Sequence, residues 1–367
     1  MSEPAFLRLR KMAEEKGTQT YTVEIQLSHI KSGIILSGKD KRMKVAFIYQ
    51  AKEPPIINGI KKPMKPGGYS DGCADMAYCL RNGGTDVITP AENPDVYKDT
   101  DWCFPDTHEG IQQAIDKGAD TLWLNTVLYN GHPIDDFSGI YVVGHRTKDV
   151  EMYNDKFSTN TLLLQNELPA VTDYLVTADT VYNGEYPCVL KPIMGRGSQG
   201  VVKCDTPEEF IKARDEAFAS GRYGDTMMAE EYLSGTEVAL TVFPDGTSLP
   251  FIERFDQKNG IAPYNGDVPV VKNSRVIEDT PQLTALRKSC ELAVWLLGLK
   301  AMVRIDCRAD KNGNYRMFDF NPKPNLTGAS RPHRQNLNSL SLMAAEAAGM
   351  DYFGLLSKML ETRYMLN

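Results

Sequence analysis

The residues best suited to chemistry occupy one stretch of the chain, residues 299–324, which reads LKAMVRIDCRADKNGNYRMFDFNPKP. Within it, Asn312-Gly313 is a dipeptide typical of a two-residue β-hairpin turn. A hairpin with that turn places Asp306 directly opposite Asp319, with both carboxylates on one face of the sheet. Two opposed carboxylates repel each other unless a cation lies between them, which points to a divalent metal ion.

The same register places Arg304 opposite Asn321, on the face that carries the two aspartates. Two charged oxygen donors and one amide oxygen suit Mg²⁺ that is shared with substrate phosphates. The alternative is a solvated outer face of a hairpin, which the apolar flanking residues disfavour. A three-residue turn would shift this register. The predicted metal ligands are Asp306, Asp319 and Asn321.

A glycine-rich run, GRGSQG at residues 195–200, provides a second chemical signal. It matches the dinucleotide-binding pattern, but that site needs a helix straight after the glycines, and here the strand-like VVKC follows. The longer string GRGSQGVV matches the kinase pattern, yet neither HRD nor DFG occurs in the chain. What remains is a strand, a glycine loop and a strand, whose backbone amides can close over phosphates.

Other motifs for binding nucleotides or metals are incomplete or consist of single residues. GIILSGKD, at residues 33–40, places Asp40 where a P-loop needs a hydroxyl group. The five histidines include no pair four residues apart, which disfavours zinc. Lys156, Lys191 and Glu237 each suit a nucleotide site, although each alone is more often an ordinary surface residue.

The elements that position these residues alternate between strand and helix in the first part of the chain. The apolar run at residues 43–51 predicts a buried strand, followed by a helix over 74–84 and a strand over 85–90. The order of helix, glycine and strand recurs over residues 106–125. This alternation favours an α/β domain with a mainly parallel sheet.

Later segments predict two smaller α+β units. Thr206-Pro207 and Thr280-Pro281 are typical helix starts, each with a capping residue followed by proline. The predicted divisions are an N-terminal extension at 1–42, an α/β domain at 43–148, a small central domain at 149–226 and a C-terminal domain with the metal site at 227–367.

The composition is that of an ordinary globular protein. The 367 residues are 42% hydrophobic, and 41 basic against 48 acidic residues give a net charge of −7, which disfavours nucleic acid as a partner. Seven cysteines without a CxxC pair indicate reduced thiols. We find neither a membrane-spanning run nor a secretory signal, so we expect a cytoplasmic protein that does not bind membranes.

In four strings the sequence resembles the ATP-grasp enzymes, and among them the D-alanine–D-alanine ligase group. The strings are NDKFSTNTLLLQNELP, CVLKPIMGRGSQGVVK, MMAEEYLSGTEVAL and VRIDCRADKNGNYRMFDFNPKPNLTGAS. Their order and spacing together are specific, and the resemblance covers residues 43–360. It implies a three-domain ATP-grasp fold, ATP and two Mg²⁺ as cofactors and, by analogy, a homodimer.

The resemblance also implies a role for each matching residue. Contacts to the ATP phosphates are implied for Lys156, Lys191, Gly195, Gly197, Ser198 and Gly200. Contacts to the adenosine are implied for Glu230, Glu231, Tyr232, Leu233 and Glu237. Arg304 would stabilise charge on an acyl phosphate, while Ser330 and the backbone of 325–328 would face the acyl substrate.

The implied reaction joins a small-molecule carboxylate to an amine. The carboxylate attacks the γ-phosphorus of ATP, and the amine then displaces phosphate from the acyl phosphate. Alternatives are an ATP-grasp small-molecule kinase or carboxylase, and a non-catalytic ATP-binding protein. The basic residues considered for binding substrate carboxylates are Lys258, Arg275, Lys323, Arg331 and Arg334.

Three departures from the D-alanine ligase pattern bear on the substrate. KPMKPGGYSDG, at residues 62–72, lacks the glutamate that D-alanine ligases carry after their first strand. Asp319 stands where they usually have glutamate, and Asn325 stands where they usually have glycine. We therefore expect an amino-acid or small-peptide ligase of specialised metabolism rather than a D-alanine–D-alanine ligase.

Overall fold

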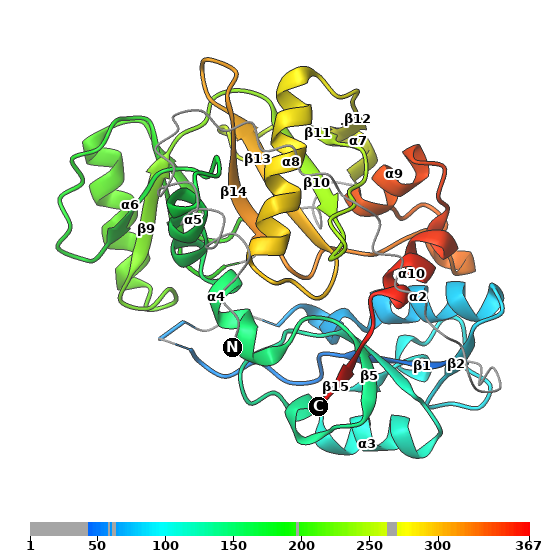
Figure 1. Cartoon of the computed structure of the whole chain (residues 1–367). Helices are drawn as coiled ribbons and strands as arrows, with labels where there is room; N and C mark the ends of the chain where they lie inside the picture. The colour runs from blue at the N-terminus through cyan, green and yellow to red at the C-terminus, as the bar shows by residue number, and fades with distance from the viewer. Residues whose placement is uncertain (1–42, 58, 61–63, 196–197, 263–269) are drawn as a thin grey trace, which may run out of the picture. The chain divides into compact units, whose positions relative to one another are not determined.

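The structure is a computed structural model that describes residues 43–57, 59–60, 64–195, 198–262 and 270–367. The predictions for residues 1–42 and for Gly197 lie outside this part of the chain. The described residues form a six-stranded, a five-stranded and a four-stranded sheet with helices packed on them (Figure 1). This arrangement confirms the predicted α/β class with α+β parts, while the bounds of the three domains stay a prediction.

The six-stranded sheet is parallel except at one edge. Its order is β15-β5-β4-β1-β2, with β3 also beside β1. The strands span Lys44–Tyr49 (β1), Asp86–Ile88 (β2), Phe104–Pro105 (β3), Thr121–Asn125 (β4), Ile140–Val143 (β5) and Tyr364–Leu366 (β15). β15 comes from the end of the chain and runs antiparallel to β5, so the last residues of the chain return to the first sheet.

Helices cover both faces of this sheet, as a parallel sheet requires. Val45 and Phe47 of β1 pack with α2 (Ser70–Asn82), whereas Ala46 and Ile48 pack with α3 (His108–Asp116). The alternation along β1 therefore places α2 and α3 on opposite faces (Figure 1). Two late helices, α9 (Leu340–Ala347) and α10 (Tyr352–Glu361), share the core on the α2 side.

The four-stranded sheet is antiparallel, in the order β6-β9-β7-β8. Its strands span Asp173–Val176 (β6), Cys188–Pro192 (β7), Val202–Cys204 (β8) and Met227–Glu231 (β9). Phe210 of α6 (Pro207–Ala219) is buried against it. Thr206 accepts a hydrogen bond from the Glu209 amide, which confirms the predicted start of α6. The helices that precede this sheet are α4 (Val150–Asn154) and α5 (Lys156–Gln165).

The five-stranded sheet is also antiparallel, in the order β12-β11-β10-β13-β14. Its strands span Glu237–Val242 (β10), Ile252–Arg254 (β11), Ser274–Val276 (β12), Val303–Ala309 (β13) and Tyr315–Asn321 (β14), with α7 at Val270–Asn273. α8 (Pro281–Leu296) packs on this sheet and buries Leu283, Leu286 and Cys290 (Figure 1). Their helical spacing predicts that face, and the Thr280 cap is confirmed.

Candidate active site

The hairpin of β13 and β14 places the four predicted polar residues together. Arg304 pairs with Asn321 and Asp306 pairs with Asp319, so the predicted register is confirmed. Arg304 donates two hydrogen bonds to the Asp306 carboxylate, of 2.7 and 2.8 Å, and Asn321 Nδ2 lies 3.0 Å from Asp306 Oδ2. Burial by itself would lower the pKa of Arg304, but the nearby Asp306 carboxylate outweighs it and raises that pKa.

The predicted turn of this hairpin is wrong, and a second irregularity compensates for it. Asp310 pairs with Asn314, which leaves a three-residue loop with Gly313 at φ +84°. Such a loop shifts the register by one residue. A bulge after Asp306 restores it, because Cys307 pairs with Met317 and leaves Phe318 as the extra residue.

The bulge also joins the hairpin to a neighbouring strand. Lys191 lies in β7, and its ammonium group donates to the carbonyl oxygen of Phe318 at 3.1 Å. The same group forms an ion pair with Glu230 at 2.5 Å, where both side chains are buried. Burial raises the pKa of Glu230, and the positive charge of Lys191 opposes that rise. Lys191 thus links two sheets through one cation.

Lys156 reaches the hairpin from a helix start. It is the first residue of α5, where Asp155 caps the helix by accepting a 2.8 Å hydrogen bond from the Ser158 amide. The backbone amide of Lys156 donates to the carbonyl of Ile193 at 3.1 Å, and its ammonium group forms an ion pair with Asp319. The cap and the backbone bond therefore aim this lysine at the predicted metal ligands.

These groups line a cavity with about 840 Å³ of space, counted to its open mouth. The following predicted residues lie on its wall: Lys156, Lys191, Gly195, Ser198, Glu230, Glu231, Tyr232, Leu233, Glu237, Asp306 and Asp319. Arg304 and Asn321 contact Asp306 from behind the wall. The cavity thus joins residues that lie as far as 163 positions apart in the chain, such as Lys156 and Asp319.

The cavity wall also includes a buried carboxylate, Glu237 in β10. Its oxygens meet Arg254 at 3.5 Å and Gln257 at 2.9 Å. Burial raises the pKa of Glu237 to about 7, although the Arg254 charge opposes this, and the Asp306 charge adds to it. The group therefore changes its charge near neutral pH, within the segment that the family resemblance links to the ribose.

Arg308 is a wall residue that the sequence analysis missed. Its guanidinium donates to the Tyr232 hydroxyl at 3.2 Å, to Gln257 at 2.5 Å and to the Gly260 carbonyl at 2.5 Å. It thereby ties the predicted adenine-binding segment to the loop at 257–260. The signal was present, because Arg308 follows Arg304 and Asp306 at the spacing that keeps side chains on one face of a strand.

The glycine loop is described on either side of residues 196–197. Ser198 has φ +59°, a strained value for a residue with a side chain, and its hydroxyl donates to the Ala262 carbonyl at 3.4 Å. Gly200 has φ +72°, and an added Cβ would lie 2.6 Å from the Tyr223 ring. Gly200 is therefore required by the backbone, and it does not line the cavity.

Several predicted substrate-binding residues are placed elsewhere. Ser330 does not line the cavity, and its hydroxyl is buried with no hydrogen-bond partner among the described residues. Arg331 is fully buried and bonds Asp75 at 2.9 Å and Asp99 at 2.7 Å. Arg334 also bonds Asp75, at 2.8 Å, so these two arginines hold α2 in place, and the fully buried Arg331 is not placed to bind a substrate carboxylate.

Of the three remaining basic candidates, two lie at the surface. Lys258 is exposed, and Arg275 is paired with Glu253 at 2.7 Å. Lys323 differs, because its ammonium group stacks on the Tyr69 ring, 3.3 Å from the centroid. Since Tyr69 ends the turn after β1, Lys323 lies at the side of the hairpin that faces the first sheet.

Comparison with known families decides the identity of this fold. A family profile described as "D-ala D-ala ligase C-terminus" matches residues 164–361, more than half of the chain. The chain belongs to this family. It is an ATP-grasp ligase, an ATP-dependent carboxylate–amine ligase of the D-alanine–D-alanine ligase kind.

Individual relatives agree with the profile. A D-alanine–D-alanine ligase from Mannheimia succiniciproducens is 29% identical over 221 residues, 56% of this chain and 67% of the relative. One from Phocaeicola vulgatus is 28% identical over 188 residues, 48% of this chain and 52% of the relative.

Solved structures support the fold. The D-alanine–D-alanine ligase of Bacillus anthracis, complexed with ATP, superposes with a TM-score of 0.62 at 19% identity, over 87% of this chain and 97% of that one. The D-Ala:D-Ser ligase VanG of Enterococcus faecalis gives 0.59 at 15% identity, over 88% and 99%. In the part of the chain that the structure describes, no helix is both long and apolar enough to cross a membrane.

Proposed function

We propose that this ligase activates a carboxylic acid as an acyl phosphate, with ADP as the first product, and then transfers the acyl group to an amine. The observation that carries the proposal is that Asp306, Asp319 and two lysines line one cavity, with Arg304 and Asn321 in contact with Asp306. Phosphoryl transfer depends on positioning and charge neutralisation, which this set provides. No protein nucleophile is required by this route.

The donor set at the hairpin fits Mg²⁺. Asp306 and Asp319 supply carboxylate oxygens from facing strands, and Asn321 supplies an amide oxygen when its side chain is turned. Bound there, Mg²⁺ would neutralise charge on the phosphates. Among the described residues, no group of three His, Cys, Asp or Glu side chains is placed to hold a metal, so the amide is needed to complete the set.

Binding of ATP and stabilisation of the developing charge would be carried out by side chains of the protein. Lys156 and Lys191 would bind the phosphates, and Gly195 and Ser198 would cover them. A covered phosphate excludes water, which would otherwise hydrolyse the acyl phosphate. Arg304, held by two hydrogen bonds to Asp306, would stabilise the charge that develops on the acyl oxygen. The segment 230–233 would bind adenine, and Glu237 the ribose.

We further propose that the acid is not D-alanine. The turn after β1 provides one acidic residue among its described positions 64–72, Asp71. Its carboxylate bonds Lys65 at 2.9 Å and Arg334 at 3.3 Å. Burial would raise the pKa of Asp71, but the Lys65 charge outweighs it and lowers that pKa. Since Asp71 is committed to these cations, it is not available to an amino group of the acid substrate.

A trapping experiment tests the reaction. The protein is incubated with ATP, Mg²⁺, hydroxylamine and pooled acids, and nucleotides and hydroxamates are identified by mass. We expect ADP, phosphate and a hydroxamate whose mass names the acid. AMP with pyrophosphate would contradict the acyl-phosphate route. ADP with a stable phosphorylated product that hydroxylamine does not intercept would instead indicate a small-molecule kinase.

A further inference from the structure

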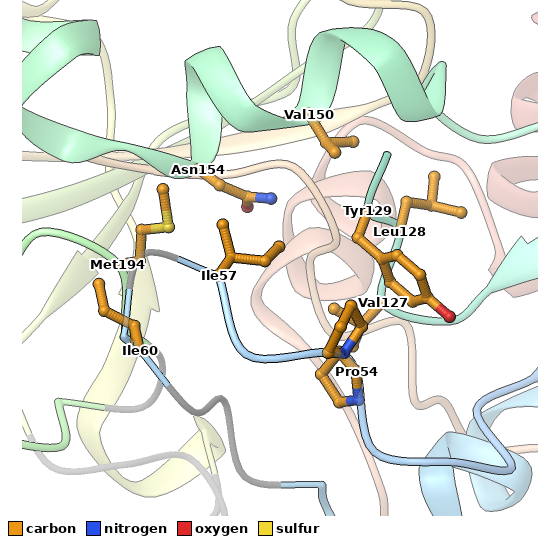
Figure 2. Close-up of a pocket in the computed structure, with 10 residues that line it drawn as sticks. Pro54, Ile57, Ile60, Val127, Leu128, Tyr129, Val150, Asn154 and Met194 are labelled. Carbon is orange, nitrogen blue, oxygen red and sulfur yellow. The ribbon is translucent and has the colours of Figure 1, made fainter. Parts of the chain in front are cut away.

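A second cavity lies beside the nucleotide cavity and has a different chemistry. Figure 2 shows the side chains that line it, which surround a small space. The lining consists of proline, isoleucine, valine, leucine and methionine, with Tyr129 and Asn154 as the polar exceptions. Among the described residues that line it, none carries a charge. A charged group placed there would lose its hydration without gaining a partner.

The position of this cavity is that of a ligand site in an α/β protein. One wall, which includes Ile57 and Ile60, follows β1, and another, at Val127 to Tyr129, follows β4. Both strands end at the carboxyl edge of the parallel sheet. Open α/β sheets bind their ligands at that edge, because the loops that leave neighbouring strands form a crevice there.

The third wall is shared with the phosphate side of the nucleotide cavity. Met194 lines the apolar cavity, and the next residue, Gly195, lines the nucleotide cavity. Asn154 likewise lies two residues before Lys156, whose backbone is bonded to Ile193. A single strip of chain therefore separates the two cavities, so a molecule seated in one can present a reactive group to the other.

A buried carboxylate holds the first two walls together. Asp106 accepts a 2.8 Å hydrogen bond from the Ala51 amide, at the start of the segment after β1. Its other oxygen accepts a 2.5 Å hydrogen bond from Thr126, at the start of the segment after β4, and faces His132 at 3.3 Å. His132 accepts from the Ile134 amide, so its remaining ring nitrogen donates to Asp106. The two segments that carry these walls are thus held together before any ligand binds.

We propose that this cavity holds the apolar side group of the carboxylic acid that the ligase activates. The preferred acids then carry an aliphatic group no larger than that of leucine in place of the methyl group of alanine. The inference rests on the proposed function, since it assigns the part of the acid that lies away from the phosphate. Each additional methylene group in an apolar pocket improves discrimination by about tenfold or more.

The first test compares acids in the hydroxylamine assay. Both enantiomers of leucine and phenylalanine, with 4-methylpentanoate, are set against both enantiomers of alanine and aspartate. We expect kcat/KM to be at least about tenfold higher for the best apolar acid than for alanine or aspartate. An enzyme that uses alanine or aspartate as well as the apolar acids would overturn the proposal.

The second test changes the cavity itself. Ile57→Trp places a larger side chain in the cavity, and the matched control is Ile56→Trp at a neighbouring position that is 65% exposed. We expect Ile57→Trp to lower kcat/KM at least tenfold for the best apolar acid, with a smaller effect on alanine, while the control matches the wild type. Val127→Ala should shift the preference towards bulkier acids. Equal losses for all acids in Ile57→Trp, together with an unchanged preference in Val127→Ala, would refute the assignment.

A binding measurement separates this inference from the proposed reaction. If no acid yields ADP, the proposed reaction fails, and titration calorimetry with 4-methylpentanoate is carried out in the presence of Mg²⁺ and a non-hydrolysable ATP analogue. Binding that Ile57→Trp weakens and Ile56→Trp preserves would support the cavity as the acid site. No detectable binding, or binding equal in all three proteins, would overturn it.

Discussion

The nucleotide cavity and the apolar cavity are neighbours, yet they are built from opposite kinds of side chain. The first is lined or backed by four ion pairs: Lys156–Asp319, Lys191–Glu230, Arg254–Glu237 and Arg304–Asp306. The second has no charged lining residue in the described part of the chain. Buried ion pairs are weak stabilisers compared with apolar packing, so their concentration at one cavity agrees with the proposed role in binding phosphates and metal. The apolar cavity is suited to selecting a substrate.

The largest effect is expected at the proposed metal ligands. Asp319→Ala removes one of two opposed carboxylates, and we expect turnover to fall by at least about 10³-fold, since charge neutralisation is the main catalytic contribution. ADP release measures the rate, and thermal unfolding checks the fold, which should be retained. Chelation of Mg²⁺ should abolish turnover in the wild type. A metal-dependent, active Asp319→Ala enzyme would refute the metal assignment.

The next effect concerns the buried ion pair between Lys191 of β7 and Glu230 of β9. Lys191→Met leaves the Glu230 carboxylate buried without its cation, which we expect to lower the free energy of unfolding by about 3–5 kcal/mol at pH 8. The loss should be smaller near pH 5, because a buried carboxyl with a raised pKa takes up a proton as the pH falls.

Urea unfolding of Lys191→Met and of the matched double variant Lys191→Met/Glu230→Gln measures this effect. The double variant should regain most of the stability, because it removes the unpaired charge. ATP affinity should stay weak in both proteins. Unchanged ATP affinity in Lys191→Met would remove the proposed role of this lysine in binding phosphate.

A third, smaller effect is the pH dependence that Glu237 confers on the free energy of unfolding. Its folded-state pKa, about 7, is above the ordinary value of 4.5, so the folded protein binds a proton more readily than the unfolded chain. Its contribution to stability therefore falls as the pH rises from about 4.5 to about 7, by about 3 kcal/mol. Glu237→Gln should lack this dependence. A difference between the two unfolding free energies that stays constant from pH 4.5 to pH 7 would contradict the assignment.

The smallest effect concerns Asp106, which holds together two walls of the apolar cavity. Asp106→Asn places an amide group where Ala51 and Thr126 both donate hydrogen bonds, and we expect a loss of about 1–3 kcal/mol in unfolding free energy. Asp179→Asn, at an exposed position, is the control and should have little effect. Should Asp106→Asn be as stable as the control, Asp106 does not preorganise the two walls.

The sequence correctly predicted that Asp306 and Asp319 lie opposite each other, but part of the reasoning was wrong. The opposition of Asp306 and Asp319 was derived from a two-residue turn, whereas the structure has a three-residue turn and a bulge at Phe318. The two irregularities cancel at the metal residues. Turn type depends on the φ values of single residues and a bulge depends on packing around it, so neither follows from the dipeptide Asn312-Gly313 alone.

The partners of charged side chains were predicted least well where the two residues lie far apart in the sequence. Arg331 and Arg334 were considered as ligands for a substrate carboxylate, yet they bond Asp75, which lies more than 250 positions away in the sequence. Arg308 was passed over although it shares a strand face with Asp306. A sequence shows which side chains are charged, but the partner of each charge depends on which segments meet, and that is a property of the folded chain.

The sequence by itself determined the local elements, the α/β class and the family, because strand alternation, helix spacing and capping residues act over a few positions. The order of its four motifs was sufficient to indicate an ATP-grasp ligase. Only the tertiary structure decided which charges pair, how the hairpin bulges, and that an apolar cavity lies beside the phosphate side. Those features join segments far apart in the chain, so burial and packing determine them, and local spacing does not.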